Sequence, residues 1–151
     1  MESIISNLIT TLGAFVLVYL SVIKDNYSSK YKIRREQLDK FYIPFYKLYC
    51  RGFLSENPLS LMTPEVRGSI LELLSDNIHL MEPLSQSMYS QYYKSYLDLL
   101  EAEDGCSHFS LSEARAQMDS TFKVLSQSIF MEYNQLLKKA KLPVPMPLHR
   151  V

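Results

Sequence analysis

Apolar residues fill the first part of the chain almost without interruption. Residues 4–23, IISNLITTLGAFVLVYLSVI, carry no charge, and Ser, Thr and Asn occupy only five of these twenty positions. A helix of that length, at about 1.5 Å per residue, reaches about 30 Å, which is the thickness of the hydrocarbon core of a bilayer. The pattern therefore predicts a transmembrane anchor at residues 1–23.

The charges that flank this run are unequal. No Lys or Arg precedes it, whereas five basic residues follow it closely: Lys24, Lys30, Lys32, Arg34 and Arg35. Basic residues next to a span hold that flank in the cytoplasm. We therefore expect an inner-membrane protein that crosses the membrane once, with its N-terminus outside and its C-terminus in the cytoplasm. The same five residues are expected to contact anionic lipid headgroups.

Two other interpretations of the run fit the pattern less well. A cleavable signal peptide needs a positive N-terminal region and a small-x-small cleavage site, but only Glu2 precedes the run and Val22-Ile23-Lys24 ends it. A buried helix of a soluble domain stays open, because the Ser, Thr and Asn residues dilute the apolar character. Twenty uncharged residues are nevertheless long for a core helix.

Beyond the run, apolar residues recur every three or four positions in four segments, which is helical spacing. These helices are expected at about residues 31–54, 63–82, 84–101 and 111–139. Pro44 should kink the first of them near Lys40–Pro44, or start a new helix there. Thr63-Pro64-Glu65 is a typical helix start, and Ser110 with Glu113 forms a capping box.

Helices joined by short loops favour an antiparallel bundle, so the predicted fold class is all-α, with an N-terminal transmembrane helix followed by a four-helix cytoplasmic bundle. After the anchor, residues 24–40 form a basic juxtamembrane segment that continues into the first cytoplasmic helix. Residues 41–141 form the helical cytoplasmic domain. Residues 142–151 form a Pro-rich tail, which its three prolines keep extended and which docking could order.

Composition narrows the possible functions. The chain has eleven Tyr and seven Phe, and at helical spacing such residues are typical of a core, although a tyrosine stripe can also line a groove. Residues 24–51 carry eight Lys and Arg against three Asp and Glu, whereas residues 52–151 carry eight against twelve. The basic surplus lies next to the membrane and not in the distal domain, so a nucleic-acid partner is not expected.

Recognisable catalytic motifs are missing from the sequence, and we expect neither an enzyme nor a cofactor. His79 and Glu82 could offer two metal ligands, and Cys106 with His108 could complete a site, but their spacing matches no known metal pattern, so no metal site is expected. Cys50 and Cys106 are expected to be unpaired, buried or half-buried thiols, since a disulfide is not expected in the cytoplasm.

One stripe of the anchor carries small and polar side chains at alternating steps of four and three: Ser3, Asn7, Thr10, Ala14, Leu17 and Ser21. Such a seam lets membrane helices approach closely and hydrogen-bond to one another, so we expect a homo-oligomer. Asn7 should face another helix or a lumen, because an amide is costly in hydrocarbon. Alternatively, Asn7 lies shallow enough to reach headgroup water.

The anchor and the segment KYKIRREQLDKFYIPFYKLY that follows it resemble, in layout, small single-pass membrane proteins of bacteria and of phage defence with a helical cytoplasmic domain. Membrane-anchored accessory proteins of RNA-targeting CRISPR effectors are among these proteins. The resemblance implies a self-associating membrane pore or effector in bacterial antiviral defence. The Arg–His signature of HEPN nucleases is absent, so ribonuclease activity is not expected. The alternative is a membrane-tethered helical module that recruits a cytoplasmic protein partner.

Overall fold

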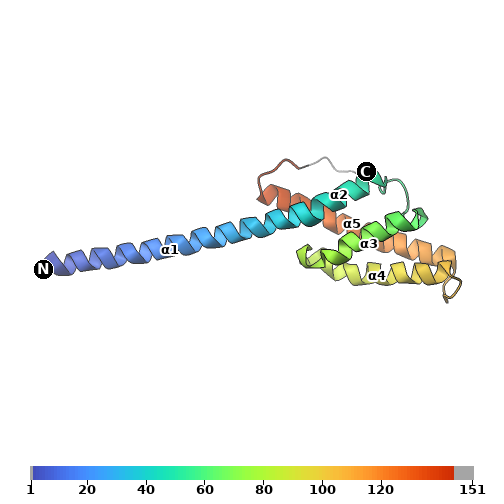
Figure 1. Ribbon diagram of the computed structural model, residues 1–151, viewed down its shortest axis with the longest axis horizontal. Helices are drawn as coiled ribbons and strands as arrows, with labels where there is room; N and C mark the ends of the chain where they lie inside the picture. Colours follow the sequence, from blue (N-terminus) through green and yellow to red (C-terminus); the bar gives the residue numbers. More distant parts are fainter. Residues whose placement is uncertain (1, 145–151) are drawn as a thin grey trace. The chain divides into compact units, whose positions relative to one another are not determined.

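The structure is a computed structural model that describes the backbone of residues 2–144 and the side chains of residues 15–144. It divides into two compact units, Met1–Arg35 and Glu36–Val151. Within the described backbone every regular element is a helix, as Figure 1 shows, which confirms the all-α prediction.

The transmembrane part of that prediction is not supported by the described helices. None of them combines the length and apolar character needed to cross a membrane. The anchor predicted at residues 1–23 rests largely on residues 1–14, whose side chains lie outside the described residues.

Helix α1 runs without a break from Glu2 to Gln37. The prediction of a separate helix that begins at about Tyr31 is therefore wrong, because the anchor segment and the basic segment belong to one helix. The physical reason lies in the residues between them. Residues 24–30, KDNYSSK, contain neither Pro nor Gly, and charge alone does not end a helix.

The interruption predicted near Pro44 is confirmed as a change of helix type. A π-helical turn, η1 (Leu38–Tyr42), separates α1 from α2 (Ile43–Arg51). At its end the Ile43 N–H donates to the carbonyl of Leu38, five residues back. Proline has no N–H to donate and its ring crowds the preceding turn, so the wider π turn falls where the regular ladder would fail. Pro44 then occupies the first turn of α2, where a missing N–H costs little.

The remaining helices follow the predicted order, with two short 3₁₀ turns between them: η2 (Leu59–Leu61), α3 (Pro64–Asp76), η3 (Ile78–Leu80), α4 (Pro83–Glu103) and α5 (Leu111–Lys139). The capping box at Ser110 and Glu113 is confirmed. Thr63 precedes α3 as expected, but its hydroxyl does not cap a backbone amide. Instead it bonds to the carboxylate of Glu65 and thereby lowers the pKa of that group.

The bundle is built on the long pair α4 and α5, which lie side by side in Figure 1. Helix α2 packs on α3, and η1 packs on α5. Aromatic rings fill the space between them: Tyr42, Tyr92, Phe41 and Phe45 are almost fully buried. Burying one such side chain contributes about 1.5–3 kcal/mol. Most of the rings meet at tilted or edge-on angles, whereas Tyr42 and Tyr133 are stacked. The tyrosines at these positions therefore serve the core, as their spacing predicts.

The two cysteines differ from the prediction. Cys50 and Cys106 are both free, as expected, but both are exposed and neither is a buried thiol. Cys106 lies in the loop after α4, where a buried chain would leave backbone groups unpaired. Cys50 lies on α2 next to the buried Tyr49, on the side of the helix that faces solvent.

Candidate functional site

The apolar part of α1 exposes its side chains on every side. From Phe15 to Ile23, eight large apolar or aromatic side chains have exposed fractions between 47% and 71%. Successive residues of an α-helix point about 100° apart, so nine consecutive residues cover the whole circumference. Ser21 is the only small polar residue among them. This section therefore has no polar face to turn toward water.

The predicted seam lies on this helix but is only partly described. Leu17 and Ser21 lie one turn apart on α1, and both are exposed. The side chains of Ser3, Asn7, Thr10 and Ala14 lie outside the described residues, so the seam itself stays a prediction.

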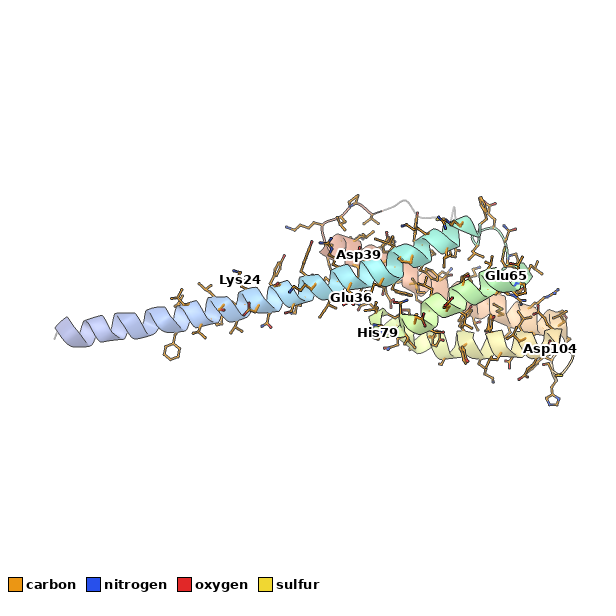
Figure 2. All side chains as sticks on the ribbon, in the orientation of Figure 1. Lys24, Glu36, Asp39, Glu65, His79 and Asp104 are labelled. Atoms are coloured by element: carbon orange, nitrogen blue, oxygen red, sulfur yellow. The ribbon has the colours of Figure 1, made fainter. Side chains whose placement is uncertain are left out.

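The predicted headgroup residues all lie on the C-terminal half of α1. Lys24, Lys30, Lys32 and Arg35 are exposed and Arg34 is half-buried; Figure 2 labels Lys24 on this helix. Because the helix is continuous, Lys24 and Arg35 are separated by about 16 Å along its axis. The five cations therefore lie at different heights and are spread over about 200° of the helix circumference, so they do not form one stripe.

A buried carboxylate holds three elements of the bundle together. Glu132 of α5 is 5% exposed. Its Oε1 accepts the Ser85 N–H at 2.9 Å, and its Oε2 accepts the Ser85 hydroxyl at 2.5 Å and the Tyr42 hydroxyl at 3.0 Å. Burial raises the pKa of Glu132, although these hydrogen bonds oppose the shift. The Tyr42 pKa is raised as well, first by burial and then by the charge of Glu132.

A second set of bonds extends this cluster to the end of α1. The Gln37 amide donates to the Leu80 carbonyl at 3.0 Å and to the Glu82 carboxylate at 3.2 Å. The Glu82 N–H donates to the Tyr42 hydroxyl at 3.2 Å. We call Gln37, Tyr42, Glu82, Ser85 and Glu132 the junction cluster. It fixes the π turn and the start of α4 against α5.

One feature of the sequence points to this cluster: a Glu on the apolar face of the last helix. Glu132 follows Leu125 and Ile129 at helical spacing, and Leu136 continues the same apolar face. A carboxylate in such a position is rarely buried without partners. Its partners could not be read from the sequence, since Ser85 and Tyr42 lie 47 and 90 residues away.

Two further polar contacts join elements of the bundle: one joins α3 to α4, and the other joins η2 to α5. Arg67, which is 3% exposed, forms a bidentate pair with Glu103 at 2.9 and 2.8 Å. Asp119 accepts the Ser60 N–H at 2.8 Å and the Ser60 hydroxyl at 2.7 Å, which pins η2 to α5. Both contacts pair side chains with other residues of the fold.

Two grooves lie on the described surface of the bundle. A groove of about 460 Å³ lies between α4 and α5, with Ser95 and Ala114 as its floor and Gln91, Lys94, Asp98 and Phe109 among its walls. A groove of about 310 Å³ lies between the loop after α2 and α5. Neither contains a member of the junction cluster, so the buried carboxylate has no access to a ligand from either groove.

The metal ligands considered from the sequence do not converge. His79 lies at η3 (Figure 2) and is exposed, while Glu82 bonds to Gln37. Cys106 and His108 are exposed in the loop after α4. Across residues 15–144, no group of three His, Cys, Asp or Glu side chains could hold a metal ion.

Comparison with known proteins adds no relative: no protein family, curated protein or solved structure matches this chain.

Proposed function

We propose that this chain is a single-pass inner-membrane protein that self-associates through α1 and carries its helical bundle on the cytoplasmic side. The observation that supports the proposal best is the exposed apolar circumference of residues 15–23. An α-helix that is apolar all round needs a cover other than water, either lipid or other protein. The apolar sequence continues through residues 4–14, so a full span is available.

The basic residues after the apolar section support the proposed orientation. Lys24 lies at the end of the apolar run, where headgroups begin, and anionic headgroups attract a nearby cation by about 1 kcal/mol. Arg34 and Arg35 lie about 15–16 Å farther along α1. For a helix along the bilayer normal, they act through the screened field of the surface, whose range is about 8 Å. Lys24 and Lys30 should therefore contribute more to lipid binding than Arg35.

Reporter fusions test the orientation. A reporter that is active only in the cytoplasm should be active after residue 144, and one that is active only outside should be silent there. The reverse result would overturn the topology.

Self-association rests on the seam of small and polar residues. Each cross-helix hydrogen bond in a membrane contributes roughly 0.5–2 kcal/mol. Asn7→Leu should reach the membrane in normal amounts, since Leu inserts readily, but it should weaken the oligomer. Leu20→Ile, which lies off the seam, is the matched control. Equal particle size in detergent for wild type and Asn7→Leu would overturn the role of the seam.

The resemblance in layout extends the proposal to a membrane pore or effector in bacterial antiviral defence. Overproduced wild-type protein should then make cells permeable to a small dye or lower their membrane potential. Asn7→Leu should reduce that effect and Leu20→Ile should not. Unchanged permeability at high membrane levels would overturn the pore while leaving the anchor intact.

The alternative function, a tethered module that recruits a cytoplasmic protein, is favoured by one observation. The groove between α4 and α5 presents Lys94, Asp98 and Gln91 with no partner among the described side chains, beside the exposed ring of Phe109. A recruiting module should be monomeric in detergent and harmless when overproduced. Particle size of the detergent-purified full-length protein therefore separates the two functions.

A further inference from the structure

The section of α1 that follows the apolar run has two different sides. Figure 1 shows α1 as one unbroken helix, and Tyr27 and Tyr31 lie one turn apart on it, with exposed fractions of 74% and 55%. Successive residues point about 100° apart, so Tyr31 lies about 40° from Tyr27 around the helix. Three cations lie within about 60° of Tyr27 on the same side: Lys24, Lys30 and Arg34. We call these five residues the tyrosine face.

The opposite side of the same section is different in composition. Asp25 and Ser29 lie about 160° from Tyr27, and both are exposed. Lys32 and Ile33 also point away from the tyrosine face, at about 140° and 120° from Tyr27. Both aromatic rings of residues 24–35 and three of their five cations therefore lie on one side of α1.

The tyrosine face continues one side of the apolar section. Three exposed apolar side chains lie within about 40° of Tyr27 around the helix, with exposed fractions between 47% and 55%: Val16, Leu20 and Ile23. Along this side the helix changes from apolar side chains to a mixture of tyrosines and cations. That order matches the order of hydrocarbon and headgroups at the surface of a bilayer.

The two tyrosine rings reach the depth of the headgroups in the proposed topology. Tyr27 and Tyr31 follow Ile23 by four and eight residues, which is about 6 and 12 Å along the axis. Side chains of an α-helix lean toward its N-terminus and cover the preceding turn. For α1 that direction is toward the membrane, so the Tyr31 ring lies about one turn closer to the span than its own Cα. The headgroup region is about 5–7 Å thick on each side of the hydrocarbon core, so both rings reach it.

We propose that the tyrosine face contacts anionic lipid headgroups and sets the direction in which α1 tilts in the membrane. The inference rests on the proposed single-pass anchor and names the side of α1 that meets the lipid surface. A tyrosine ring is apolar with a polar hydroxyl, which suits the interface. The three cations are attracted by anionic headgroups, whereas Asp25 on the opposite side is repelled. Interfacial tyrosines and cations of this kind set the tilt of a membrane helix.

The predicted seam leaves this side of α1 free. Leu17 and Ser21, the described members of the seam, lie about 80° and 120° from Tyr27 around the helix. A second copy that packs on the seam therefore leaves the tyrosine face in contact with lipid. Self-association and the tilt use different sides of the same helix.

Single tryptophans test the tilt in the full-length protein, because the sequence contains no Trp. The protein is reconstituted into vesicles of equal parts phosphatidylglycerol and phosphatidylcholine with brominated chains, which quench a nearby Trp. In an upright helix, position 29 lies about 3 Å nearer to the span than position 31, so Ser29→Trp would be quenched more. A tilt of about 30° lowers the tyrosine face and raises the opposite side by about 3 Å each. Tyr31→Trp should therefore be quenched more than Ser29→Trp.

Tyr19→Trp, within the apolar section, reports insertion separately. It should be strongly quenched by the brominated chains when the anchor is inserted. Without that quenching, both the proposed anchor and the tilt would fail. If Tyr19→Trp is quenched but Ser29→Trp is quenched as much as Tyr31→Trp or more, the tilt is overturned and the anchor stays intact.

The role of headgroup charge is measured in the Tyr31→Trp protein. Vesicles of phosphatidylcholine alone should reduce the quenching, because they remove the attraction for the cations. Lys30→Gln should reduce it in the mixed vesicles. Lys32→Gln, on the other side of α1, is the matched control and should have little effect. Equal quenching for Lys30→Gln and Lys32→Gln would overturn the part of the proposal that gives the cations of the tyrosine face a role in the tilt.

Discussion

Helices α1 and α5 differ in the burial of their apolar side chains. In α5, Met118, Leu125 and Ile129 lie on one face and are fully buried, while the opposite face carries polar residues. In α1, residues 15–23 are apolar on all faces and none of them is buried. Helix α5 is built for a boundary between core and water. The apolar part of α1 is suited to surroundings that are apolar on every side of the helix.

A positive charge introduced into each of these helices should give the largest difference, which is a difference in the membrane-bound fraction. Val16→Arg places a cation near the centre of the predicted span, at a cost of about 2.5–3.5 kcal/mol for insertion, so the membrane-bound fraction should fall sharply. Val124→Arg on α5, which is exposed to a similar degree, is the control and should stay at the membrane. Carbonate extraction followed by immunoblotting measures both. Equal membrane retention of the two variants would contradict the proposed anchor.

Inside the bundle, the junction cluster should be the most sensitive polar site. Glu132→Ala leaves the Ser85 N–H and two hydroxyls without their acceptor, which should cost about 3 kcal/mol of unfolding free energy. Chemical denaturation of the detergent-solubilised protein measures this change. Glu72→Ala, at an exposed position on α3, should change the value by less than about 0.5 kcal/mol. A similar cost for both variants would show that the cluster does not stabilise the fold.

Loss of the Arg67–Glu103 pair should have the next largest effect on the free energy of unfolding. Glu103→Ala leaves a guanidinium that is almost fully buried without its carboxylate, and its Nε already lacks a partner among the described residues. Because Glu103 itself is partly exposed, water can reach the vacated side, and we expect a cost of about 2 kcal/mol. Glu101→Ala on the exposed side of the same helix is the control. Thermal unfolding should separate the two variants by several degrees.

The pH dependence of stability should depend on Glu132. Its pKa in the folded protein is raised above the ordinary 4.5, because burial disfavours the carboxylate. The fold therefore binds this proton more tightly than the unfolded chain does, and stability should fall as pH rises from about 4.5 through the raised pKa. Glu82 adds negative charge nearby and acts in the same direction. Glu132→Gln should lack this part of the pH profile, and identical profiles would contradict the raised pKa.

The capping box should give the smallest effect. Ser110→Ala removes the oxygen that accepts the Glu113 N–H, and loss of such a cap costs about 1 kcal/mol. Ser120→Ala, at an exposed position within α5, should be neutral or slightly stabilising because Ala favours helix. Differential scanning calorimetry of the two variants measures the difference. An unchanged melting temperature for Ser110→Ala would show that solvent replaces the cap.

Local signals predicted most of the bundle. Periodic apolar positions and helix starts at Pro64 and Ser110 located α3, α4 and α5 to within a few residues, apart from the C-terminal end of α3 at Asp76. The continuity of α1 does not follow from these signals, because the change from apolar to basic residues at Lys24 suggests a structural boundary. That change alters the preferred solvent and leaves the backbone hydrogen bonds unaffected.

Long-range polar contacts could not be predicted in the same way. The junction cluster joins Gln37, Tyr42 and Glu82 with two residues of α4 and α5, and its pairing depends on how helices far apart in sequence pack. The three- or four-residue period of apolar positions shows which face of each helix is buried. It does not show which residues of two helices contact each other. The exposure of Cys50 follows the same rule, because the packing of α2 decides which of its faces meets α3 and α5.

The π turn at Leu38–Tyr42 has a consequence for the length of the chain. A π turn holds one residue more than the α-helical turn that it replaces. Deleting one residue within it should therefore leave a regular helix in which the residues on either side of the turn keep nearly the same faces. A deletion one turn later, within α2, would instead shift Phe45 and Tyr49 out of the core. The turn is thus a place where the chain tolerates the loss of one residue, because Phe45 and Tyr49 keep their positions in the core.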